Sequence, residues 1–122
     1  MNTAAEYAIG IDIGGTTSKF GIVNHRGDIS NIGEIDTKNH KDINLFIDEL
    51  YNELQPAIQT IGGIEYIKGI GVGAPNGNYY SGTIEYAPNL QWRGIIPLAK
   101  LITDKFNVPC TLTNDANAAT IG

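Results

Sequence analysis

The chain has 122 residues, enough for one domain, and its 42% hydrophobic and 17% charged residues are typical of a globular protein. Its formal net charge is −5, and its eight basic residues are scattered, which argues against nucleic-acid binding. A single cysteine excludes an intrachain disulfide, and without a secretory signal or an apolar span we expect a cytoplasmic protein with no membrane partner.

The first third of the chain alternates short apolar runs with turn residues, which predicts strands. The three predicted strands are residues 7–12, 18–23 and 29–35. Their short connections imply an antiparallel meander. From Ile43 to Ile61 the apolar residues then recur at helical spacing, and Asp42 is a suitable N-cap. Pro56 lies inside this helix and is expected to kink or split it.

The second half of the chain returns to strands separated by a long polar segment. Residues 67–74 predict a buried strand, and residues 75–94 form an Asn-, Gly- and Tyr-rich segment with a weak hairpin signal. Pro97 opens a second helix, residues 109–113 form a last strand, and a further helix begins near Ala116. The order predicts an α/β domain in which an antiparallel meander is followed by parallel strands, with helices packed on this mixed sheet.

The turn between the first two strands contains Gly14, Gly15, Thr16 and Thr17. Adjacent glycines let the backbone approach a ligand closely, with N–H groups that can surround an anion, and the threonine hydroxyls add donors. Asp12, just before the turn, is suited to hold Mg²⁺ through water. The alternative is an ordinary Gly-Gly hairpin whose amides Asp12 satisfies.

A second polar pair, Asn114 and Asp115, falls between the last predicted strand and the last predicted helix. Ligands bind at such sheet edges. Asp115 is placed to accept the proton of an attacking hydroxyl, and Asn114 to fix a neighbouring one. The alternative is a pair of N-cap residues, since Asn and Asp are favoured there.

Four segments in this order carry a family resemblance. They are Gly10-Ile-Asp-Ile-Gly-Gly-Thr16, Gly71-Val-Gly-Ala74, Ala87-Pro-Asn-Leu90 followed by Trp92, and Asn114-Asp-Ala-Asn-Ala118. Together they resemble the ROK family (repressors, open reading frames and sugar kinases) of the actin-like ATPase, or ribonuclease H-like, fold. The resemblance implies that residues 1–122 are the N-terminal lobe of a two-lobe sugar kinase.

The resemblance also implies roles for particular residues. The implied ATP phosphate-binding residues are Gly14, Gly15, Thr16 and Thr17, with Asp12 near Mg²⁺. The implied sugar-binding residues are Asn114, Asp115, Asn89, Asn76 and Gly77, with Asp115 as the catalytic general base. The chain departs from the family at two points. Thr17 stands where Lys is common, with Lys19 two positions further on, and Asn76 stands where Gly is common.

The expected activity is ATP-dependent phosphorylation of a hexose hydroxyl, most readily of glucose, although N-acetylmannosamine and fructose kinases share these motifs. Adenine-binding residues, further sugar ligands and any structural zinc are expected only in the second lobe, so residues 1–122 alone should have negligible activity. A homodimer of the full-length protein would be unsurprising. A sugar-responsive regulator of the same family is disfavoured by the dozen residues before Gly14, too few for a helix-turn-helix. A non-catalytic sugar-binding module is a further alternative.

Overall fold

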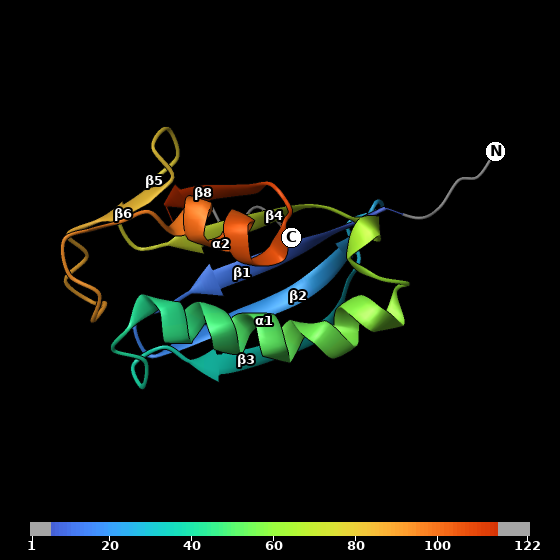
Figure 1. Ribbon diagram of the computed structural model, residues 1–122, viewed down its shortest axis with the longest axis horizontal. Coiled ribbons are helices and arrows are strands. Elements are labelled where there is room, and N and C mark those ends of the chain that lie inside the picture. The colour runs from blue at the N-terminus through green and yellow to red at the C-terminus, as the bar shows by residue number, and fades with distance from the viewer. Residues whose placement is uncertain (1–5, 115–122) are drawn as a thin grey trace.

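A mixed five-stranded sheet forms the centre of the computed structural model, which describes residues 6–114 (Figure 1). Its spatial order is β3-β2-β1-β4-β8. The strands are β1 (Tyr7–Ile13), β2 (Thr17–Asn24), β3 (Ile29–Asp36), β4 (Ile67–Ala74) and β8 (Cys110–Asn114). β1 to β3 pair antiparallel, whereas β4 runs parallel to both β1 and β8. The predicted meander with added parallel strands is therefore confirmed.

Residues 6–114 contain the helices α1 (Ile43–Thr60) and α2 (Leu98–Phe106), which pack against each other over one face of the sheet (Figure 1). The further helix predicted to begin near Ala116 lies outside the described residues. A short 3₁₀ turn, η1 (Ile64–Tyr66), leads into β4. Asp42 caps α1 as predicted, because its carboxylate accepts the N–H of Asn44 at 2.8 Å.

Pro56 was expected to kink or split the first helix, and the split is wrong, because α1 continues to Thr60 as one helix. Pro56 and Asn52, one turn earlier, are both exposed. The carbonyl that loses its helical partner can therefore be hydrated.

Alternation along β1 separates the two faces of the sheet. Ile9, Ile11 and Ile13 are almost fully buried among the helices, whereas Asp12 between them is exposed. The core is closed by fully buried residues of α1 such as Phe46 and of α2 such as Ile102. The sheet therefore presents the carboxylate that follows the apolar run on the side away from α1 and α2.

A second, small antiparallel sheet projects beyond the end of β4. It consists of β5 (Gly77–Asn78), β6 (Thr83–Glu85) and β7 (Ile95–Ile96), in that order. The predicted hairpin is confirmed, whereas β7, which has only two residues, was not predicted.

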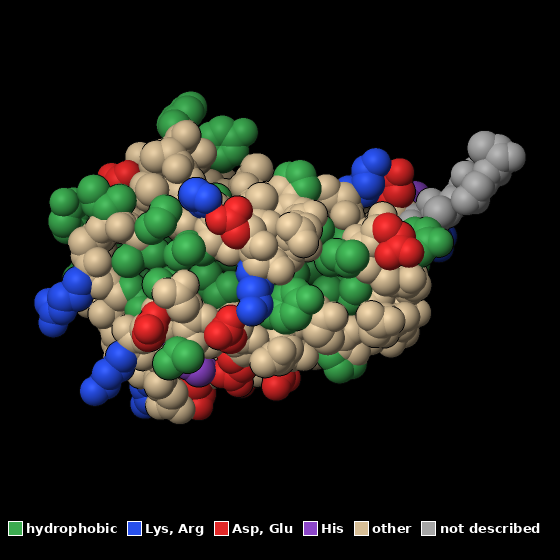
Figure 2. Space-filling view, viewed as in Figure 1, with side chains coloured by type: hydrophobic (Ala, Val, Ile, Leu, Met, Phe, Trp, Pro, Cys, Tyr) green, Lys and Arg blue, Asp and Glu red, His purple; other side chains and the backbone are tan. Residues whose placement is uncertain are grey.

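The surface of the described region mixes charges of both signs. On the face drawn in Figure 2, basic side chains are spread singly among acidic ones. Within residues 6–114, no helix is both long and apolar enough to cross a membrane.

Candidate functional site

The turn between β1 and β2 is closed by its own backbone. The N–H of Gly14 donates to the carbonyl oxygen of Thr17 at 3.0 Å. A Cβ added to Gly14 would lie 2.7 Å from that same oxygen, so a side chain does not fit there. Gly14 therefore gives the turn its tight shape, and its N–H is already used.

The next residues of the turn face the long polar segment. A Cβ on Gly15 would lie 2.9 Å from the carbonyl oxygen of Asn89. The N–H groups of Gly15 and Thr16 donate to no group within residues 6–114, and Thr16 is exposed. Two neighbouring N–H groups without a partner in this region, next to glycine backbone that a ligand can approach closely, are suited to bind a phosphate oxygen. The turn thus brings a candidate phosphate-binding backbone into contact with a candidate sugar-binding residue.

Thr37, directly after β3, anchors this turn. Its N–H donates to the carbonyl oxygen of Thr16 at 2.8 Å, and its hydroxyl bonds that of Ser18 at 2.5 Å. Both Thr37 and Ser18 are buried. Sequence reasoning missed Thr37, because a single threonine after a strand carries no signal of a partner 21 positions earlier.

Asp12 offers a carboxylate next to the turn. It lies in register with Lys19 on β2 and with Gly73 on β4, on the face of the sheet opposite the core. Within the described residues, Asp12 takes part in no ion pair or side-chain hydrogen bond. An unpaired carboxylate at a strand end fits a Mg²⁺ ion that keeps most of its waters. Lys19 is exposed and likewise unpaired in this region.

The end of β8 lies level with Asp12 across the sheet. Gly73 is in register with Thr113, so Asp12, Gly73 and Thr113 form a line across three adjacent strands. Two strand spacings separate β1 from β8 by about 10 Å. Asn114, the last residue of β8, is exposed at this edge. Asp115 lies outside the described residues, so its role as general base stays a prediction.

Asn76 ties the small sheet together, and Gly77 brings it against β8. The Asn76 side-chain amide donates to the carbonyl oxygens of Glu85 at 2.9 Å and Tyr86 at 3.2 Å. A Cβ on Gly77 would lie 2.5 Å from the carbonyl oxygen of Thr113, so only glycine allows this approach. Asn76 has a φ of +57°, a left-handed conformation that Gly and Asn adopt most readily, which explains the departure noted above.

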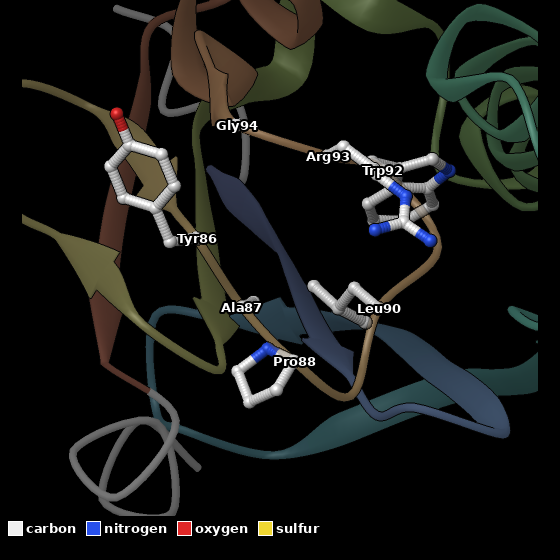
Figure 3. Close-up of a pocket in the computed structure, with 7 residues that line it drawn as sticks. All are labelled: Tyr86, Ala87, Pro88, Leu90, Trp92, Arg93 and Gly94. Atoms are coloured by element: carbon white, nitrogen blue, oxygen red, sulfur yellow. The ribbon is translucent and has the colours of Figure 1, made fainter.

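The loop of residues 86–94, between β6 and β7, curves around a pocket of about 400 Å³ (Figure 3). Tyr86 and Trp92 lie on opposite sides of it. Tyr86 is 70% exposed, and its φ of +53° is unusual for an aromatic residue. Tyr79 and Tyr80, in contrast, contact each other at the hairpin tip and do not line this pocket.

Comparisons with known proteins show the family and the fold. Residues 8–122 match the family model described as the ROK family. The chain is 34% identical to a xylose repressor of Caldicellulosiruptor bescii and 31% identical to a glucokinase of Streptomyces coelicolor, with 93% of the chain covered each time. The crystal structure of a ROK family glucokinase from Streptomyces griseus, in complex with glucose and AMPPNP, superposes with a TM-score of 0.74 at 29% identity, covering 93% of the chain.

The chain is much shorter than these relatives. It spans 29% of the length of the xylose repressor, 34% of the S. coelicolor glucokinase and 34% of the S. griseus glucokinase chain.

Proposed function

Because this chain belongs to the ROK family and has the actin-like ATPase fold of ROK sugar kinases, we propose that it is the N-terminal lobe of a kinase that phosphorylates a hexose with ATP. The observation that carries this proposal is the contact between Gly15 and Asn89. It joins the glycine turn, whose Gly15 and Thr16 N–H groups donate to no group within residues 6–114, to the loop that the resemblance assigns to the sugar. Glucose is the first substrate to test, since two of the relatives above are glucokinases.

The proposed division of labour follows the positions of the side chains. Mg²⁺, when bound with ATP, neutralises charge on the phosphates, and Asp12 would hold it through water. The N–H groups of Gly15 and Thr16 would bind phosphate oxygens. Asn89 and Asn114 would orient the sugar, so that one of its hydroxyls points at the terminal phosphorus of ATP.

Asp115 would complete the reaction as general base. As the sugar oxygen bonds to the terminal phosphorus, the bond from this phosphorus to the bridging oxygen breaks and ADP leaves. Asp115 would accept the proton that the hydroxyl gives up. The proposal thus assigns the base to the chain continuation of β8, at the edge where Asn114 is exposed.

A substrate panel on the full-length protein tests the activity. ADP release is measured with ATP, Mg²⁺ and each of glucose, N-acetylmannosamine, fructose and allose. The Asp115→Asn variant should lose about 10²- to 10⁴-fold in kcat while its melting temperature is preserved, since an amide caps a helix but accepts no proton. The matched control is Asp104→Asn, an exposed residue of α2 whose ion pair with Lys100 lies on the surface. No sugar-dependent ADP release with any hexose would refute the proposal.

A second candidate, a sugar-responsive transcription regulator, is favoured by the 34% identity to a xylose repressor. The two functions separate in one experiment on the full-length protein. A regulator should bind operator DNA and change its affinity when xylose is added, without consuming ATP. A kinase should release ADP when its sugar is added and should not bind DNA.

A further inference from the structure

Residues 37–40 lie between the two halves of the proposed site and are hydrogen-bonded to both. On the phosphate side, the carbonyl oxygen of Thr16 accepts the N–H of Thr37 at 2.8 Å and that of Lys38 at 3.4 Å. Because Thr37 is buried and also bonds Ser18, this end of the segment is fixed to the sheet. Residues 37–40 and the phosphate turn are therefore expected to move together.

On the sugar side, the same segment is held by two side chains of the loop of residues 86–94. The Gln91 amide donates to the carbonyl oxygen of Lys38, and Nε1 of Trp92 donates to that of His40 at 3.0 Å. Trp92 is only 3% exposed, and its ring packs on Phe46 with centroids 4.8 Å apart. Gln91, in contrast, is exposed, so its one described hydrogen bond can be removed with little effect on packing.

We infer that Gln91 and Trp92 are positioning residues that couple the sugar loop to the phosphate turn, so that hexose and nucleotide bind cooperatively. The inference rests on the proposed kinase function. Asn89 precedes Gln91 by two residues and touches Gly15 directly, while Gln91 reaches the turn only through residues 37–40. Two separate connections thus join the loop to the turn, and ordering of one half by its ligand lowers the cost of ordering the other.

The test measures this coupling directly. The sugar of the panel that binds best is titrated into the full-length protein by calorimetry, with and without saturating AMPPNP. The ratio of the two dissociation constants is the coupling factor. Gln91→Met removes the donor at nearly constant length, and Gln59→Met is the matched control. Gln59 is an exposed residue of α1 whose side chain makes no hydrogen bond within residues 6–114.

We expect the coupling factor to fall about fivefold in Gln91→Met, because a neutral hydrogen bond contributes about that much, and to stay at the parent value in Gln59→Met. Trp92→Phe removes the N–H and part of a buried ring, so it should reproduce the loss of coupling and also lower the melting temperature. A merely structural role would lower the melting temperature without changing this ratio.

Three results would overturn the inference. If Gln91→Met, Trp92→Phe and the parent have the same coupling factor, these residues take no part in the coupling. If the parent itself shows no coupling, the two residues have no coupling to transmit. In both cases the kinase proposal would stand. A parent that binds neither AMPPNP nor any sugar of the panel would refute the kinase function, and the inference with it.

Discussion

The backbone of Gly15 lies against the backbone of Asn89, although the two residues are far apart in the sequence. A Cβ on Gly15 would be 2.9 Å from the carbonyl oxygen of Asn89 and 3.4 Å from its Cβ. The nearer of these distances is shorter than any ordinary contact, and the atom it meets belongs to backbone rather than to a side chain that can rotate. The space between the two loops therefore admits glycine alone.

The substitution Gly15→Ala should separate the phosphate turn from the sugar loop. We expect kcat/KM of the full-length kinase to fall by about 10- to 100-fold, because a displacement of this size misplaces the reacting groups. Gly10→Ala is the matched control, since its Cβ would meet only a Val23 methyl group at 4.0 Å. Equal steady-state kinetics for the two variants would show that the close contact has no part in catalysis.

The thiol of Cys110 provides a prediction of pH dependence. Burial raises its pKa from an ordinary 9.0 to about 12. The folded chain thus keeps a proton that the unfolded chain releases, so this group's contribution to stability is fully present below pH 9 and is lost between pH 9 and about 12. At pH 8, alkylation of native Cys110 should be about a thousandfold slower than in denaturant, since three pKa units separate the two thiols.

Iodoacetamide labelling, followed by mass spectrometry of the Cys110 peptide, measures this rate. The native rate should rise about tenfold per pH unit beyond pH 9, whereas the rate in denaturant should level off there. A native rate that levels off near pH 9 would contradict the burial of the thiol.

Much of the fold was predictable because local patterns and tertiary structure agree. The alternation of Ile9, Ile11 and Ile13 with polar or small residues fixes β1 and its buried face. Asp42 precedes the apolar stripe of α1 and caps it. In both cases the residues that decide the element are neighbours in the sequence.

The rest depends on contacts between distant residues that no local pattern records. The bond of Thr37 to Ser18, the approach of Gly77 to Thr113 and the donation from Trp92 to His40 all join separate elements. The resemblance indicated that the glycine turn and the sugar loop belong to one site, but not that they touch. At Pro56 the local pattern predicted a split that α1 does not have. Pro56 lies on the exposed side of α1, where the helix tolerates its missing N–H.

Asn76 combines a backbone role with a side-chain role, and two substitutions separate them. Asn76→Gly should lose only the two hydrogen bonds of the amide, about 1–2 kcal/mol in the free energy of unfolding. Asn76→Ala should lose about 1 kcal/mol more, because alanine resists a φ of +57°.

Asn107 at the C-cap of α2 is the matched control, with a φ of +59° and no side-chain hydrogen bond within the described residues. There the glycine variant should be nearly neutral, and the alanine variant about 1 kcal/mol less stable. Urea unfolding of the four variants measures these differences. Asn76→Gly as stable as Asn107→Gly would mean that the Asn76 amide contributes nothing to the small sheet.

Asp12 provides the prediction that bears most directly on the metal. Its carboxylate ends the apolar run of β1, is exposed beside the phosphate turn, and has no charged partner within residues 6–114. If it holds Mg²⁺ through water, Asp12→Asn should raise the Mg²⁺ concentration that gives half-maximal activity by about 10- to 100-fold, because the amide lacks the charge that orients the metal's waters. Titration of Mg²⁺ at fixed ATP and sugar measures this shift, and excess Mg²⁺ should restore part of kcat.

Asp104→Asn removes one carboxylate from an exposed ion pair on α2 and should leave the Mg²⁺ dependence unchanged, which controls for the change in net charge. An Asp12→Asn variant with the parent's Mg²⁺ titration curve would show that Asp12 does not hold the metal.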